Sequence, residues 1–264
     1  MTQYARERDA AIHIALKAGT ILERLYGNLS GELEMKGRRD WCTKADKESD
    51  ALVQEELRFR FPDDDIVSEE SDPLDRGAVR KWVIDPLDGT WAFTRGFPLE
   101  VPSVSIALTV EGRPVVGVVY APLPEKSFEL YWAVEGEGAF LHDKKIVVNP
   151  SDDLGTATVV HDIGKKDRWR IGSVVTKLLQ NDGVMACPSF GGAASSYARV
   201  ASGVLHGSAT IGLDPWDNAA GAVLLREAGA KVTDFDGREW RLGGETLLAA
   251  NPRMHQKLLG LLNA

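Results

Sequence analysis

The sequence is short of cysteine, of long apolar runs and of positive charge, and each shortage excludes a class of protein. Its two cysteines, Cys42 and Cys187, lie far apart and do not make a disulfide framework or a zinc site. No stretch approaches the ~18 consecutive apolar residues that a membrane span requires. The first residues mix both signs of charge, unlike a secretory signal peptide. We therefore expect a cytoplasmic protein without a membrane partner.

The charge balance argues against nucleic acid as a partner. The formal net charge is −8 at pH 7 and the pI is about 5.2, whereas proteins that bind a nucleic-acid backbone or an anionic membrane are usually basic. We expect no nucleic-acid partner. An acidic protein that handles an anionic substrate needs a local source of positive charge, and a bound metal ion is one such source.

The chain is long enough for a large core, since 264 residues with 44% hydrophobic content can form one big domain or two tightly packed halves. Hydrophobic periodicity predicts helices over residues 11–25, 44–59, 167–180, 193–203, 216–229 and 252–262. Alternation and β-branched content predict strands over residues 66–68, 82–84, 101–110, 114–120, 128–132, 157–162, 183–187 and 207–213. The change in pattern predicts an α/β (α+β) fold with halves at 1–148 and 149–264.

Two carboxylates, Asp85 and Asp88, follow an apolar strand in the segment WVIDPLDGTWAF, residues 82–93. Pro86 fixes φ and donates no hydrogen bond, which favours a turn over continuation of the strand. In such a turn the two carboxylates could converge while the carbonyl of Leu87 points into the same space, which suits a hard cation such as Mg²⁺. An equally good interpretation is an Asp-Pro-x-Asp-Gly turn without any metal.

Further residues bear on the choice between a turn and a metal site. Gly89 and Thr90 could open a helix whose free N–H groups face an anion such as phosphate. Glu69 and Glu70 end a short strand, and Asp217 begins a helix. Taken singly, the glutamate pair is typical of a solvated loop and Asp217 of a helix cap. Three acidic segments in one chain together favour a metal cluster.

These segments, with SEES upstream and PWDNAAG downstream, resemble the inositol monophosphatase family of Mg²⁺-dependent, lithium-sensitive phosphatases. The similarity extends over nearly the whole chain and includes GVVYAP, EGEGAF and REAGAKVTDFDG. The resemblance implies a layered α/β/α/β/α sandwich, a homodimer and a phosphoric monoester hydrolase for a small phosphorylated metabolite. The wider superfamily also holds fructose-1,6-bisphosphatases, 3′(2′),5′-bisphosphate nucleotidases and histidinol-phosphate phosphatases.

The resemblance also assigns the metal ligands. It implies that Glu69, Asp85 and the Leu87 carbonyl bind a first Mg²⁺. Asp85, Asp88 and Asp217 would bind a second, with Asp85 as the bridge. A third and weaker ion would lie near Glu69. Paired cations suit phosphate-ester hydrolysis, because they neutralise charge on both the entering and the leaving oxygens.

Catalytic and substrate contacts come from the same resemblance. Asp46, in the segment WCTKAD, and the Thr90 hydroxyl would orient and deprotonate the attacking water. Glu70 matches the second Glu of the family's Glu-Glu pair and would assist through water. Ala193 falls where the family contacts the part of the substrate that is not phosphate. The implied substrate contacts are Asp88, Gly89, Thr90 and Ala193.

The sequence departs from the family pattern on the substrate side. Members that act on inositol carry a Glu seven residues before the Asp of the Trp-Asp element. That position is Thr210 here, and Asp214 is the acid that lies closer to the motif. Inositol monophosphate is therefore the default substrate, while histidinol phosphate, a sugar bisphosphate and a 3′-phosphonucleotide stay open.

Two surface segments also differ from the usual pattern or stand out in charge. An insertion near residues 100–102 could reshape the rim of the site or a subunit contact. The basic cluster of Lys36, Arg38 and Arg39 could meet a second phosphate, but we favour a solvated turn.

Two rival functions need other features. A non-catalytic relative would lack a metal ligand or part of the pair that activates water, yet all of these residues are present. A phosphatase that forms an aspartyl-phosphate would use Asp85 or Asp88 as a nucleophile, and it would need a lysine and further aspartates in an arrangement of its own.

Overall fold

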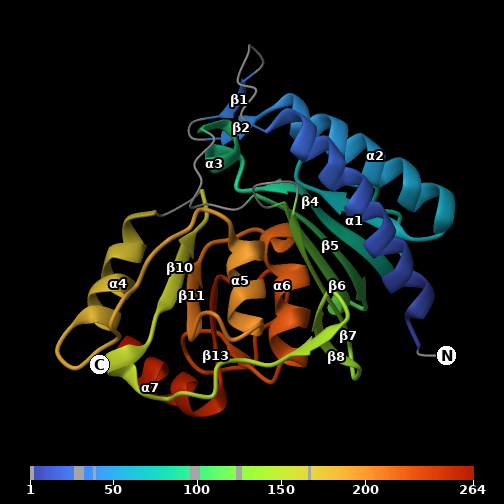
Figure 1. Ribbon diagram of the computed structural model, residues 1–264. Helices are drawn as coiled ribbons and strands as arrows, with labels where there is room; N and C mark the ends of the chain where they lie inside the picture. Colours follow the sequence, from blue (N-terminus) through green and yellow to red (C-terminus); the bar gives the residue numbers. More distant parts are fainter. Residues whose placement is uncertain (1–2, 27–32, 38–39, 96–101, 123–126, 166–167) are drawn as a thin grey trace.

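The structure is a computed structural model that describes residues 3–26, 33–37, 40–95, 102–122, 127–165 and 168–264. Its helices and sheets form five layers (Figure 1). Two helices cover the outer face of a seven-stranded sheet, a second pair lies between this sheet and a four-stranded sheet, and two more cover the far face of the smaller sheet. This α/β/α/β/α order confirms the predicted fold class.

The larger sheet is built mainly from hairpins. Its strands, in spatial order, are β3 (Asp65–Ser68), β4 (Arg80–Asp88), β5 (Ser103–Val110), β6 (Arg113–Pro122), β7 (Phe128–Val134), β8 (Gly138–Leu141) and β9 (Lys144–Ile146). β3 runs parallel to β4, and each later pair is antiparallel. The helices on its outer face are α1 (Ala5–Leu25) and α2 (Lys44–Arg60).

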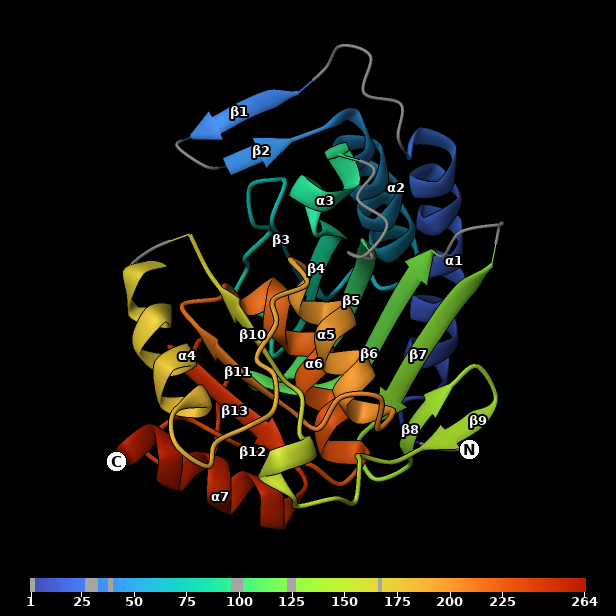
Figure 2. The ribbon, with the colours of Figure 1, turned by 60° about the vertical axis from the view of Figure 1, so that its left-hand side comes forward.

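The smaller sheet mixes parallel and antiparallel pairs. Its strands, in spatial order, are β10 (Val159–Ile163), β11 (Gly207–Ile211), β13 (Thr246–Ala250) and β12 (Lys231–Thr233). The helices packed on it are α5 (Ala193–Ala201) and α6 (Pro215–Glu227) on the inner face, and α4 (Ile171–Leu179) and α7 (Pro252–Asn263) on the outer face (Figure 2). None of the helices in the described ranges is long and apolar enough to cross a membrane.

A few short elements lie outside the two sheets. They are the hairpin of β1 (Glu34–Gly37) and β2 (Asp40–Cys42), the helix α3 (Thr90–Arg95) and the 3₁₀ turns η2 (Leu154–Thr156) and η3 (Arg168–Arg170). The hairpin and α3 lie together at one end of the molecule (Figures 1 and 2). The last residues of β4, which include the paired carboxylates, lie at this end of the molecule as well.

Pro86 does not end the strand that contains it, so the predicted turn is wrong. β4 continues to Asp88, and its register against β5 shifts between Asp85 and Asp88. Pro86 lies in this irregular stretch, where no ladder hydrogen bond needs its missing N–H, and its carbonyl accepts a hydrogen bond from the Ser49 hydroxyl at 2.8 Å. A bulge in a continuous strand therefore replaces the expected turn.

The other differences from the predicted elements concern short or edge segments. The predicted strand at 183–187 is wrong, because only Ala186 pairs, in an isolated bridge with Thr158. The short strands β8, β9, β12 and β13 were not predicted, since three to five residues carry too little periodicity. The expected insertion near 100–102 lies outside the described residues except for Pro102. The division into halves at residue 148 stays a prediction.

A row of small residues on the larger sheet lets α6 lie close to it. Gly117 in β6 pairs with Ala107 on one side and with Ala133 on the other. A Cβ atom at Gly117 would lie 2.5 Å from the carbonyl oxygen of Ala220 in α6. This close approach fixes the distance between the sheet and the helix that carries Asp217 in its first turn.

Replacing Gly117 by Ala should destabilise the protein. The added methyl group meets helix backbone, so α6 must move, and we expect the free energy of unfolding to fall by about 1–3 kcal/mol. The matched control is Gly260→Ala in the exposed part of α7, where no atom lies within 4 Å of the new Cβ. That change should stabilise the protein by about 0.5–1 kcal/mol. Denaturant titration measures both, and a Gly117→Ala protein as stable as the wild type would refute the contact.

Candidate active site

Three carboxylates from two distant segments converge at one point. Asp85 and Asp88 come from the bulged end of β4, and Asp217 comes from the first turn of α6. One oxygen from each of the three lies within 4.8 Å of the others. Asp85 and Asp88 are buried and Asp217 is partly buried. The structure thus brings together three of the residues that the sequence singled out as metal ligands.

Backbone N–H groups orient each carboxylate. Asp85 accepts a hydrogen bond from the Leu87 N–H at 3.0 Å. Asp88 accepts from the N–H groups of Ala193, at 3.2 Å, and Ala194, at 2.8 Å, which begin α5. These bonds hold the carboxylates in place while leaving other lone pairs on the oxygens able to bind a cation.

Asp217 both caps a helix and belongs to the acidic cluster, the two roles that its sequence position allowed. One carboxylate oxygen accepts a hydrogen bond from the Asp214 N–H at 2.7 Å, as a helix cap does. The same carboxylate belongs to the acidic cluster. A cap and a metal ligand are therefore compatible roles for this residue, because a carboxylate has two oxygens and about four acceptor sites.

Burial and mutual repulsion disfavour the charged forms of the cluster. Burial raises the pKa of Asp85 well above its usual value, and the charges of Glu69, Asp88 and Asp217 raise it further. Burial also raises the pKa of Asp88, to about 7, and that of Asp217. No lysine or arginine of the described residues forms an ion pair with these three. A divalent cation with oxygen ligands would remove this repulsion, so the donor set fits Mg²⁺.

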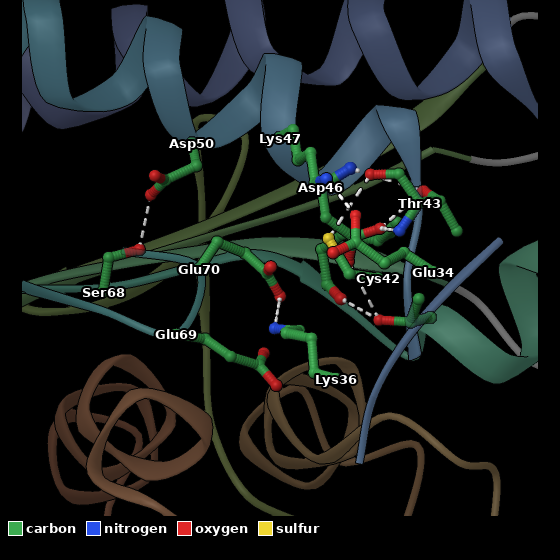
Figure 3. Close-up of polar contacts among 12 residues, drawn as sticks. Glu34, Lys36, Cys42, Thr43, Asp46, Lys47, Asp50, Ser68, Glu69 and Glu70 are labelled. Carbon is green, nitrogen blue, oxygen red and sulfur yellow. Dashed lines mark hydrogen bonds and ion pairs between the residues drawn. The ribbon is translucent and has the colours of Figure 1, made fainter. Parts of the chain in front are cut away.

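Two lysines face the glutamates that follow β3. The Lys165 amine donates to Glu69 at 2.9 Å, and the Lys36 amine donates to Glu70 at 2.5 Å (Figure 3). Glu69 is not among the three converging carboxylates, but its charge raises the pKa of Asp85. Neither glutamate lies in a merely solvated loop, because each pairs with a cation from another segment.

The interpretation of the basic cluster as a solvated turn is wrong for Lys36. The hairpin of β1 and β2 carries this lysine back over the acidic residues, where its amine is paired with Glu70. Arg38 and Arg39 lie outside the described residues, so the prediction for them stays a prediction.

Asp46 and Thr90, from segments far apart in sequence, are in contact. The Thr90 hydroxyl lies 3.1 Å from a carboxylate oxygen of Asp46 and 3.0 Å from the Leu87 carbonyl. The other Asp46 oxygen accepts from the Thr43 N–H at 2.7 Å in the capping box of α2 (Figure 3). Burial raises the pKa of Asp46 to about 7. Such a carboxylate can take a proton near neutral pH.

Most of the implied site residues line one pocket of about 170 Å³. Those that line it are Glu69, Asp85, Leu87, Asp88, Gly89, Thr90, Ala193 and Asp217. Gly89 has a positive φ of 83°, which permits the sharp change from β4 into α3. Asp46 and Glu70 lie behind this wall, and Asp46 reaches it through Thr90.

The pocket also contains residues that the sequence reasoning missed. These additional lining residues are Asp162, Lys165, Arg168, Trp41 and Trp91. Asp162 follows the same pattern as the predicted ligands, an acid at the carboxyl end of a predicted strand, and this signal could have identified it. No sequence pattern marks the two tryptophans as pocket residues, because only the folded chain brings them there.

The profile of the inositol monophosphatase family matches residues 4–264, which is nearly the whole chain. The chain therefore belongs to the inositol monophosphatase family, a family of phosphatases that generally use Mg²⁺. The acidic cluster described above is consistent with this membership.

Proteins that are similar to this chain in sequence or structure carry different names. The chain is 37% identical over 257 residues to "Nus factor SuhB" of Pasteurella multocida, covering 95% of this chain and 93% of the relative. It is 34% identical over 249 residues to "Fructose-1,6-bisphosphatase/inositol-1-monophosphatase" of Aquifex aeolicus, covering 93% and 90%. The solved structure of an IMPase from Thermotoga maritima superposes with a TM-score of 0.85 at 30% identity, covering 97% of this chain and 96% of that one.

Replacing Asp85 by Asn should stabilise the metal-free protein and remove its response to Mg²⁺. Burial and repulsion raise the pKa of Asp85 in the folded state, so the folded protein binds more protons than the unfolded chain. Metal-free stability is therefore lost as pH rises above the unfolded value of about 4. Removing one charge should raise the Tm at pH 8 and have less effect at pH 5.

Thermal unfolding with and without Mg²⁺ measures both effects. The Tm of the wild-type protein should rise when Mg²⁺ is added, and that of the Asp85→Asn protein should not. Asp63→Asn is the control, since Asp63 is an exposed carboxylate away from the cluster. A variant that loses Tm without metal, or still gains Tm with Mg²⁺, would show that Asp85 is not part of a metal-binding cluster.

Proposed function

We propose that this chain is a Mg²⁺-dependent phosphomonoester hydrolase, with inositol monophosphate as its default substrate. The observation that carries the proposal is the convergence of three carboxylates, Asp85, Asp88 and Asp217, beside the residues that open α3. Family membership supports phosphatase activity in general. Support for the substrate class comes from the Aquifex aeolicus relative, whose name gives both fructose-1,6-bisphosphatase and inositol-1-monophosphatase, and from a solved IMPase of the same fold.

The metal ligands proposed are Glu69, Asp85, the Leu87 carbonyl, Asp88 and Asp217. All five line the same pocket and offer oxygen donors, the kind that Mg²⁺ prefers. Bound Mg²⁺ would neutralise charge on the attacking and leaving oxygens and lower the pKa of water. Glu69 gives one oxygen to the Lys165 amine, and its other oxygen stays able to bind the cation.

Gly89 and Thr90 are proposed to hold the phosphate through their backbone N–H groups. The left-handed conformation of Gly89 exposes backbone to the pocket, and a larger residue there would be strained. Asp88 and Ala193, which line the same pocket, are proposed to contact the substrate as well. Their contact with each other keeps α5 next to the end of β4.

Thr90 and Asp46 are proposed to activate the attacking water. The Thr90 hydroxyl can give its proton to Asp46 and accept the proton of a water with its remaining lone pairs. The raised pKa of Asp46 suits this carboxylate to receive a proton. Glu70, held by Lys36, is proposed to assist through water.

A second candidate function comes from the names of the relatives. The SuhB relatives are named Nus factors, and that name does not describe a hydrolase. A role of this kind would not require turnover, and the predicted absence of a nucleic-acid partner finds no support in these names. The homodimer and the cytoplasmic location stay predictions.

Phosphate release from four esters tests the proposal. The panel is inositol 1-phosphate, histidinol phosphate, fructose 1,6-bisphosphate and 3′-phosphoadenosine 5′-phosphate, each with and without Mg²⁺. We expect release that depends on Mg²⁺, with inositol 1-phosphate among the substrates and no phospho-enzyme. If none of the four is cleaved, the hydrolase proposal fails and the Nus-factor role becomes the leading candidate.

Replacing Thr90 by Ala should lower kcat by about 10²–10⁴-fold and raise KM much less, because activation of water matters in the transition state. Thr90→Ser keeps the hydroxyl and is the control, which should retain most of kcat. Steady-state kinetics on the best substrate measures both variants. A rise in KM at unchanged kcat would mean that Thr90 only binds phosphate.

A further inference from the structure

The position that carries a carboxylate in inositol-specific relatives is closed to the substrate here. Thr210 is buried in β11, and its hydroxyl lies 2.7 Å from the Tyr197 hydroxyl. Tyr197 donates its one proton to the Asn218 side chain at 2.8 Å. Thr210 must therefore donate to Tyr197, which commits its hydroxyl to an internal hydrogen bond.

A different carboxylate faces the pocket from the neighbouring strand. Asp162 lies on β10, which runs parallel to β11, and it is in register with Thr210. Asp162 lines the pocket together with Asp88 and Ala193. The pocket is therefore lined by an acid from the strand next to the one that carries Thr210.

The carboxylate of Asp162 can accept further hydrogen bonds. It is buried, with 9% of its surface exposed, and it accepts one hydrogen bond, from the Ile163 N–H at 2.8 Å. Within the described ranges it forms no ion pair and accepts no other hydrogen bond. A buried carboxylate with one partner is costly unless donors from a ligand or from water complete its set.

We propose that Asp162 binds hydroxyl groups of the substrate's leaving alcohol and makes the enzyme selective for phosphorylated polyols. This inference rests on the proposed hydrolase function. A carboxylate accepts two hydroxyl donors well, and here it lines the same pocket as the residues proposed to hold the phosphate. Lys165 and Arg168 line the same side of the pocket, so a cationic leaving group would meet two positive charges.

Asp214 is the other acid on this side and provides the matched comparison. It also lines the pocket, but it is partly exposed and precedes α6, where its N–H is bound to Asp217. Replacing its side chain removes a negative charge that acts on Asp217, so it should affect all substrates alike. A change at Asp162 should affect only substrates that have hydroxyl groups.

The experiment compares inositol 1-phosphate with cyclohexyl phosphate, which has the same ring size and no ring hydroxyls. We expect Asp162→Ala to lower the ratio of kcat/KM for inositol 1-phosphate over cyclohexyl phosphate by about 10–100-fold, the value of hydrogen bonds to a charged group. Asp162→Asn keeps one acceptor oxygen and should lower the ratio less. Asp214→Asn should leave the ratio unchanged.

The outcomes separate this inference from the function on which it rests. If wild-type protein cleaves both esters and Asp162→Ala lowers them equally, Asp162 acts on the common chemistry and the polyol inference falls alone. A ratio that changes with Asp214→Asn but not with Asp162→Ala also overturns it. Selective loss on histidinol phosphate would assign Asp162 to an amine instead. If wild-type protein cleaves neither ester but cleaves another of the four esters in the panel, the polyol inference falls alone. If it cleaves none of them with Mg²⁺, the hydrolase proposal itself has failed.

Discussion

Repulsion among buried carboxylates is the constraint on which the site depends. Asp85, Asp88 and Asp217 would separate in a flexible chain, because burial and mutual charge both disfavour their ionised forms. Rigid elements hold them together instead. The bulge in β4 converges two of them, and the close approach of α6 to Gly117 brings the third. The fold thus maintains an arrangement that a cation would stabilise.

The same carboxylates that serve the site also complete the helices around it. Asp46 caps α2 and Asp217 caps α6, and Asp88 accepts the first N–H groups of α5. N–H groups at helix starts need acceptors. Asp46 and Asp217 each use one oxygen for this role, whereas Asp88 uses both. Structural and chemical roles therefore coincide, and variants at these positions need a stability measurement beside any activity measurement.

Local patterns predicted much of the fold, and register or packing decided the rest. The long helices and central strands follow from periodicity, which is strong over many residues. Pro86 was misjudged because a bulge can accommodate a residue without an N–H inside a strand. The strand at 183–187 failed because only Ala186 comes into register with a neighbour. Asp162 was missed although it shares the pattern of the predicted ligands, and only the sheet shows that it lines the same pocket as they do.

The sequence by itself determined the family and the acidic donor set, because both depend on residue identities and on spacing within short segments. Only the tertiary structure decided which acids meet. It joined Asp217 to the pair in β4 and placed lysines against Glu69 and Glu70. It also left Asp162 lining the pocket while Thr210 is buried against Tyr197. The physical reason is that strand register and helix packing relate residues far apart in the chain, and no local pattern encodes those relations.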